Sequence, residues 1–199
     1  HLSDARADVG PVNGGVMRFE PSAVAERAAL PLVIGFLDLT RFAAQSRCVD
    51  DAELAEILDQ FFGQVERHVS AAGGYVVKFM GDGALFIFHQ AAADDAVGAV
   101  LELKEAVDDA MKERGWECRL KVQLHVGTAV VGRFGAERRI DVIGQAVNTA
   151  AMLDSTGVAL SVAAFRALGA EMRRRFRKHT PPVSYIRLED PRRFRYRPM

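Results

Sequence analysis

The feature that most constrains the fold is a pair of β-rich runs, Tyr75–Met80 and Ala84–Phe88, separated by only three residues. The separating residues are Gly81-Asp82-Gly83, and glycine readily adopts the positive φ that a tight hairpin requires. A long run with helical periodicity lies on each side of the hairpin, at 51–69 and at 94–114. Because strand and helix patterns follow one another in this way, we expect a mixed α+β domain.

The other predicted elements fall into a regular order around this hairpin. An apolar run at 32–38 ends in a carboxylate and is typical of a buried strand, while strict alternation at 119–126 predicts a strand with one face on a core. A glycine-punctuated stretch at 127–135 leads to 140–144, after which shorter patterns predict a helix at 145–155, a strand at 158–161, a helix at 163–174 and a terminal hairpin. This order predicts a ferredoxin-like βαββαβ core with a C-terminal βαβ arm.

Composition limits the class of protein and of partner. Residues 1–30 mix Gly and Pro with polar side chains, which predicts a linker with one helical turn near 23–29 and leaves 31–199 as the folded domain. The 26 basic and 26 acidic residues balance, which gives no reason to propose a nucleic-acid binder. Two cysteines without metal spacing, and no apolar run near the ~20 residues of a membrane helix, predict a cytoplasmic chain without a membrane segment.

Two short patterns place carboxylates where metal chemistry is feasible. In Phe36–Phe42, Asp38 stands where a strand opens toward a helix, so it can bind a divalent cation while nearby N–H groups receive phosphate. Alone, this pattern more often describes an Asp that caps a turn. In Lys78–Gly83, Asp82 occupies the hairpin tip, where it either serves the turn or joins Asp38 in holding two hard cations on a triphosphate.

A third pattern runs from Asp141 to Gly157. Together the FxDxxxF, KxxGDG and DxxGxxVNxAAxLDSTG strings, in this order and spacing, resemble the class III adenylyl and guanylyl cyclase catalytic domains over about Leu32–Leu168. The combination is far more specific than a lone glycine loop. The resemblance implies a cyclase homology domain that forms 3′,5′-cyclic AMP and pyrophosphate from ATP, by two-metal catalysis at the interface of a homodimer.

The resemblance also implies roles for residues near the first two patterns. Asp38 and Asp82 would be catalytic and would bind two Mg²⁺ or Mn²⁺ ions, with the Leu39 carbonyl oxygen as a further ligand. These metals would lower the pKa of the ribose 3′-hydroxyl and draw charge from the leaving pyrophosphate. Thr40 and Phe42, in the turn after the first strand, would bind the phosphates of the substrate.

Further roles concern the base, the ribose and the triphosphate. Lys78 and Asp141 match the base-reading pair, and a Lys donor with an Asp acceptor suits adenine, whereas guanine would leave both groups mispaired. ATP is therefore expected rather than GTP, although Lys78 by itself also fits a solvated strand lysine. Asn148 matches a catalytic residue that orients the ribose, and Arg187, in the last expected strand, is a candidate for binding the triphosphate.

One position departs from the family pattern. Four residues after Asn148, on the same helix face, the family carries an arginine that stabilises the transferring phosphorus, and this chain has Met152. Loss of an arginine finger slows other phosphoryl-transfer enzymes by about 10³- to 10⁵-fold, so weak activity is expected. The candidates to replace the missing arginine are Arg133, Arg138, Arg139 and Arg187.

Two alternative functions follow from these observations. A catalytically degenerate domain would bind nucleotide and regulate a partner, or would join a second cyclase subunit in a heterodimer. A cyclic dinucleotide synthase shares this kind of core, but the Gly81-Asp82-Gly83 hairpin lacks the GGEEF-type loop of that family.

Overall fold

The computed structural model describes residues 17–24, 26–180 and 182–190. One eight-stranded sheet has the order β2-β3-β1-β4-β6-β8-β7, with β5 paired to β4 off this path. The strands are β1 (Arg27–Leu39), β2 (Tyr75–Met80), β3 (Gly83–His89), β4 (Leu120–Phe134), β5 (Arg139–Ile143), β6 (Val158–Leu160), β7 (Phe176–His179) and β8 (Ser184–Arg187). The helices are α1 (Phe42–Gln45), α2 (Asp51–Ala71), α3 (Ala93–Glu113), α4 (Gln145–Ala151), α5 (Val162–Ala167) and α6 (Ala170–Arg173).

The first part of the chain confirms the predicted α+β core. The order β1, α2, β2, β3, α3, β4 along the chain, with β2-β3-β1-β4 across the sheet, is the ferredoxin-like arrangement. The predicted C-terminal arm continues the same sheet, because β6 pairs parallel to β4 and β8 pairs antiparallel to β6. None of the helices in the described part of the chain combines the length and the apolar character needed to cross a bilayer.

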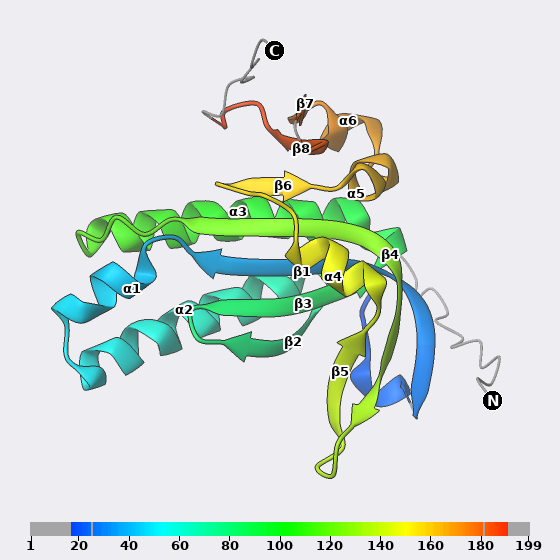
Figure 1. Ribbon diagram of the computed structural model, residues 1–199, viewed down its shortest axis with the longest axis horizontal. Coiled ribbons are helices and arrows are strands. Elements are labelled where there is room, and N and C mark those ends of the chain that lie inside the picture. Colours follow the sequence, from blue (N-terminus) through cyan, green and yellow to red (C-terminus); the bar gives the residue numbers. More distant parts are fainter. Residues whose placement is uncertain (1–16, 25, 181, 191–199) are drawn as a thin grey trace.

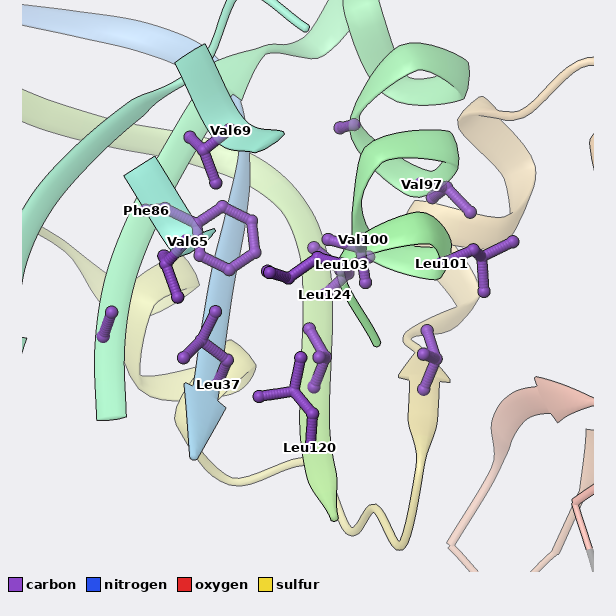
Figure 2. Packing of buried hydrophobic residues seen from close by; sticks show 14 of the residues in the cluster. Leu37, Val65, Val69, Phe86, Val97, Val100, Leu101, Leu103, Leu120 and Leu124 are labelled. Atoms are coloured by element: carbon purple, nitrogen blue, oxygen red, sulfur yellow. The ribbon is translucent and has the colours of Figure 1, made fainter. Parts of the chain in front are cut away.

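Helices α2 and α3 cover one face of the sheet (Figure 1). Helix α2 begins at the Asp50 cap, whose side chain accepts a hydrogen bond from the Glu53 N–H at 2.9 Å. Its apolar stripe packs on the sheet, and Figure 2 shows Val65 and Val69 next to Phe86 of β3. The Phe86 ring lies over Gly35, where an added Cβ would stand 2.1 Å from the ring, so the core depends on glycine at this point of β1.

A second, smaller core lies on the opposite face, beneath α4 and the segment 17–24. Phe19 and Val24 are buried there, and the Phe19 N–H donates to the Gly73 carbonyl at 2.8 Å. This segment therefore packs on the domain, while residues 1–16 of the predicted linker lie outside the described residues. The helical turn predicted near 23–29 is wrong, because β4 is long enough to pair with β1 from Arg27 onward.

Two predicted helices are shorter than their sequence patterns. Helix α4 ends at Ala151, because the following loop is bound to β4: the side-chain Nε2 of Gln123 in β4 donates to the Leu153 carbonyl at 2.7 Å. The helix predicted at 163–174 is divided into α5 and α6. At the division the Gly169 N–H donates to the Asp94 carboxylate of α3 at 2.9 Å, which replaces a bond within a continuous helix.

Candidate functional site

The sheet brings the two predicted metal ligands together. Antiparallel pairing places Asp38 of β1 opposite Gly83 of β3, and Asp82 is the residue directly before Gly83. The two strands approach so closely that a Cβ at Gly83 would stand 2.7 Å from the Leu37 carbonyl oxygen and 3.4 Å from the Asp38 Cβ. Only glycine fits this position without a shift of the backbone.

The electrostatics of the pair follow from this proximity. Burial raises the pKa of the Asp82 carboxyl above its usual value, and the neighbouring Asp38 carboxylate raises it further. Hydrogen bonds from the backbone N–H groups of Asp82 and Leu39, and the charge of Lys121, act in the opposite direction on this pKa. A carboxylate whose pKa is raised by burial and by a neighbouring carboxylate lies in a site that a cation would stabilise.

Lys121 is a member of this cluster that the sequence reasoning missed. It lies opposite Asp38 in the β1–β4 ladder, and its Nζ is 2.9 Å from Asp38 Oδ2. The signal in the sequence was its place among the outward positions of the alternating run 119–126. That signal becomes informative only when the pairing of β4 with β1 is known, since alternation alone does not say which residue stands opposite.

The residues present fit a divalent metal. Carboxylate and carbonyl oxygens are the ligands that Mg²⁺ and Mn²⁺ prefer, and Asp38, Asp82 and the Leu39 carbonyl are oxygen donors at one edge of the site. Among the described residues no group of three or more His, Cys, Asp or Glu side chains could hold a metal. The remaining ligands would therefore be solvent or the phosphates of a substrate, as is usual for Mg²⁺ sites.

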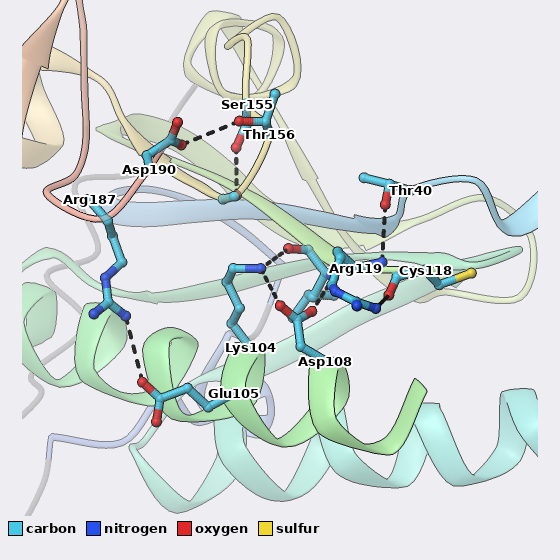
Figure 3. Close-up of polar contacts among 12 residues, drawn as sticks. Thr40, Lys104, Glu105, Asp108, Cys118, Arg119, Ser155, Thr156, Arg187 and Asp190 are labelled. Carbon is cyan, nitrogen blue, oxygen red and sulfur yellow. Dashed lines mark hydrogen bonds and ion pairs between the residues drawn. The ribbon is translucent and has the colours of Figure 1, made fainter. Parts of the chain in front are cut away.

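Thr40 and Phe42 have structural contacts in the turn after β1. The Thr40 hydroxyl accepts from the Arg119 N–H at 3.0 Å, and the Thr40 N–H donates to the Arg119 carbonyl at 2.9 Å (Figure 3). The Phe42 ring packs edge-on against Trp116, with 6.1 Å between ring centroids. Their side chains thus stabilise the turn, and phosphate binding by this turn, as predicted from the resemblance, would fall to the backbone.

Lys78 and Asp141 meet although 63 residues separate them. The Lys78 ammonium donates to both Asp141 carboxylate oxygens, at 2.9 and 2.7 Å, and Asp141 Oδ1 also accepts from the Val142 N–H at 2.8 Å. A β-bulge between Val76 and Lys78 turns the Lys78 side chain toward β5. Among the described residues, no hydrogen bond or ion pair joins this pair to the carboxylate cluster at Asp38 and Asp82.

Asn148 and Met152 lie on the outward side of α4 and just beyond its end. Both are exposed, and Met152 exposes 84% of its surface. The helix is held by Ala146 and Ala150, which are buried against the sheet. Within the part of the chain that is described, nothing covers the Asn148 and Met152 side of the helix.

Arg187 does not join the carboxylate cluster at Asp38 and Asp82. Its side chain lies on the α3 face of the sheet, where it pairs with Glu105 at 3.7 Å (Figure 3). It also pairs with Glu189 at 3.0 Å. Asp38 points to the other face, because its neighbours Leu37 and Leu39 belong to the core beneath α2 and α3. The prediction that Arg187 binds the triphosphate therefore has no support within one subunit.

The other candidates to replace the missing arginine lie at a different end of the β4–β5 hairpin from the end that leads to Met152. Arg133 donates to the Arg138 carbonyl at 3.3 Å, and Arg139 pairs with Glu137. These residues lie at the free end of the β4–β5 hairpin, whereas α4 follows the other end of β5. No arginine among them stands next to Met152 in the described structure.

Comparison with known proteins gives a consistent family assignment. Residues 26–173 match the family described as "Adenylate and Guanylate cyclase catalytic domain". The chain is 30% identical over 163 residues to adenylate cyclase 2 of Rhizobium meliloti (strain 1021), which covers 78% of this chain and 43% of that protein. It is 27% identical over 150 residues to an adenylate cyclase of Anabaena cylindrica, covering 70% and 29%. The chain thus spans less than half the length of these relatives.

Solved structures show the same fold at low sequence identity. The adenylyl cyclase CyaB from P. aeruginosa gives a TM-score of 0.70 at 20% identity, covering 84% of this chain and 98% of that one. The guanylyl cyclase Cya2 gives a TM-score of 0.68 at 24% identity, covering 80% and 92%. Since structures with both names are similar to this chain, the fold by itself does not determine which base is read.

Proposed function

Because the chain belongs to the family of adenylate and guanylate cyclase catalytic domains, we propose that it converts ATP into 3′,5′-cyclic AMP and pyrophosphate. The observation that carries the proposal is the meeting of Asp38 and Asp82 at the β1–β3 edge, with Lys121 beside them. This cluster combines paired oxygen ligands with a fixed ammonium group. Such a combination suits a triphosphate bound with divalent cations.

Each residue of the cluster has a distinct task in this proposal. Asp38, Asp82 and the Leu39 carbonyl would hold two Mg²⁺ or Mn²⁺ ions. When bound, these ions would lower the pKa of the ribose 3′-hydroxyl and neutralise the charge of the leaving pyrophosphate. Lys121 pairs with Asp38, and once metal ions bind the Asp38 carboxylate its ammonium group would be available to a phosphate oxygen. The turn after β1, which includes Thr40 and Phe42, would contribute backbone N–H groups to the phosphates.

The proposed preference for ATP rests on the Lys78–Asp141 pair. The Lys78 ammonium donates to both Asp141 carboxylate oxygens, so one donor group lies beside one acceptor group. Adenine offers N1 as an acceptor and its 6-amino group as a donor, which matches this order, whereas guanine offers the reverse. Once a nucleotide and a second copy of the chain cover this pair, a mispaired polar group there would be unfavourable by ~1 to 3 kcal/mol, enough for a clear preference.

We further propose that two copies form the site, since the surface around the base-reading residues is suited to a partner. Met80, Ile143 and Met152 expose 44%, 52% and 84% of their surfaces. Met80 follows Lys78 in β2, Ile143 follows Asp141 in β5, and Met152 follows Asn148 just after the end of α4. Exposed apolar side chains next to polar site residues are typical of protein interfaces. In the homodimer, Asn148 would orient the ribose of a nucleotide bound at the partner's Asp38 and Asp82.

A second candidate function is favoured by Met152. Its exposed thioether stands four residues after Asn148, and no arginine takes its place among the described residues. A homodimer would then lack the arginine in both sites. The chain could instead be a degenerate, nucleotide-binding subunit, or it could complete its site with a second cyclase subunit that carries the arginine.

The two unpaired cysteines, one of them exposed, agree with the cytoplasmic location that either role implies.

Two measurements test the proposal: chromatographic detection of product from ATP or GTP with Mn²⁺, and calorimetric titration of ATP binding. The parent chain is compared with Met152→Arg and with Asp82→Asn, which keeps the shape of the side chain but removes a metal ligand. Cyclic AMP from the parent, lost in Asp82→Asn, is the expected result. Product only from Met152→Arg would favour the second candidate, and no ATP binding by any variant would refute both.

A further inference from the structure

Leu120 is the first residue of β4, and among the described residues its backbone has a neighbouring strand on one side only, that of β1. Thr40 and Arg119 form a hydrogen-bonded pair, so the next pair, Leu39 and Leu120, is a non-hydrogen-bonded one. The N–H and C=O groups of Leu120 therefore point away from β1. On that side β6 pairs with β4 over Val122–Leu124, so within the described part of the chain Leu120 has no strand partner there.

Two side chains of α3 take the place of the missing strand (Figure 3). Asp108 Oδ1 accepts a hydrogen bond from the Leu120 N–H at 2.7 Å, and Lys104 Nζ donates to the Leu120 carbonyl at 2.9 Å. Lys104 and Asp108 also pair with each other at 2.7 Å, across one turn of the helix. Leu120 is fully buried, so these bonds satisfy polar groups that water does not reach.

The contact acts at the residue next to the proposed site. Successive side chains of a strand point to opposite faces, so Leu120 enters the core beneath α3 while Lys121 points to Asp38 on the other face. We propose that Lys104 and Asp108 are positioning residues for the cyclase site: they fix the start of β4 and thereby keep Lys121 opposite Asp38. The inference rests on the proposed function for its catalytic meaning, but its structural part can be tested without turnover.

The test measures amide hydrogen exchange at Leu120 and Lys121, together with KM and kcat for ATP, in Asp108→Ala, Asp108→Asn and Val107→Ala. Val107 is buried on the same helix, so Val107→Ala lowers stability while leaving the Leu120 hydrogen bonds in place. We expect exchange at both amides to rise about ten- to hundredfold in Asp108→Ala relative to Val107→Ala. We expect KM to rise about tenfold with kcat little changed, because Lys121 would bind the phosphates before and during the reaction alike.

The conservative variant separates positioning from general stability. The Asn side-chain oxygen of Asp108→Asn can still accept from the Leu120 N–H, so exchange at Leu120 and KM should return most of the way to the parent values. The inference is overturned if Asp108→Ala and Val107→Ala have the same exchange rate at Lys121 and the same KM. If the parent chain neither binds ATP nor forms product, the proposed function fails, and exchange at Lys121 alone still decides whether Asp108 positions this residue.

Discussion

Replacement of Gly83 by alanine is a direct test of the close contact that brings the two carboxylates together. The added Cβ would stand 2.7 Å from the Leu37 carbonyl oxygen, whereas ordinary carbon–oxygen contacts begin at about 3.3 Å. The contact is with backbone, which cannot rotate away as a side chain can. Strand β3 must therefore move from β1 by roughly 0.5 Å or more, and Asp82, the preceding residue, moves with it.

The expected consequences concern stability and metal binding separately. Overpacking of this kind destabilises proteins by about 1 to 3 kcal/mol, so the midpoint of thermal unfolding should fall by several degrees. Displacement of Asp82 from Asp38 should also weaken Mn²⁺ binding, by about tenfold or more, since metal ligands tolerate little change in spacing. The second effect is the specific one, because it depends on the position of Gly83 beside the cluster.

Calorimetric titration of Mn²⁺ in the presence of ATP, paired with thermal unfolding, checks both expectations. Val65→Ala serves as the matched control, since Val65 is fully buried in α2 and its truncation lowers stability without a contact to Asp38 or Asp82. The reasoning is refuted if Gly83→Ala binds Mn²⁺ as tightly as Val65→Ala does. It is also refuted if Gly83→Ala is as stable as the parent chain.

Three further predictions concern other parts of the molecule. Gly98→Ala should stabilise the chain by about 0.5 to 1 kcal/mol, measured as a higher urea midpoint, because Gly98 lies inside α3 and an added Cβ meets only Met172 at 3.9 Å. Burial lowers the pKa of His125, so below about pH 6.5 the unfolded chain binds a proton that the folded chain does not. The free energy of unfolding should therefore fall as the pH drops below this value, and urea unfolding of His125→Asn should show a smaller fall. Lys78→Met should lower kcat/KM for ATP by about 10- to 100-fold and leave the value for GTP little changed, because Asp141 loses its partner and adenine N1 loses its donor.

Much of the fold was predictable because the responsible signals are local. The α2 stripe, its Asp50 cap and the glycines between β2 and β3 each act within a few residues, and the elements formed where these patterns predict. The meeting of Asp38 and Asp82 was also expected, since it follows once β1 and β3 are neighbours in a ferredoxin-like order. Such signals survive in the sequence because they do not depend on the rest of the chain.

Other parts of the site depend on pairing between distant segments. The partners of Leu120 come from α3, and Lys121 finds Asp38 only through the register of β4 against β1. The face of the sheet on which Arg187 lies was likewise hidden, since a strand of four residues has no periodicity strong enough to assign it. These contacts are made by side chains that look like ordinary surface charges in the sequence.

The sequence by itself determined the elements of the core and the identity of the residues that we propose to bind metal and base. Only the tertiary structure determined on which face of the sheet each of these side chains lies, and Lys78 shows the reason. Strict alternation from Tyr75 would place Lys78 on the face covered by α2, together with Val76. The bulge between Val76 and Lys78 shifts the register against β3 and turns Lys78 to the opposite face, where it meets Asp141. A bulge is set by the fit of two strands and their packed faces, so one strand's sequence does not specify it.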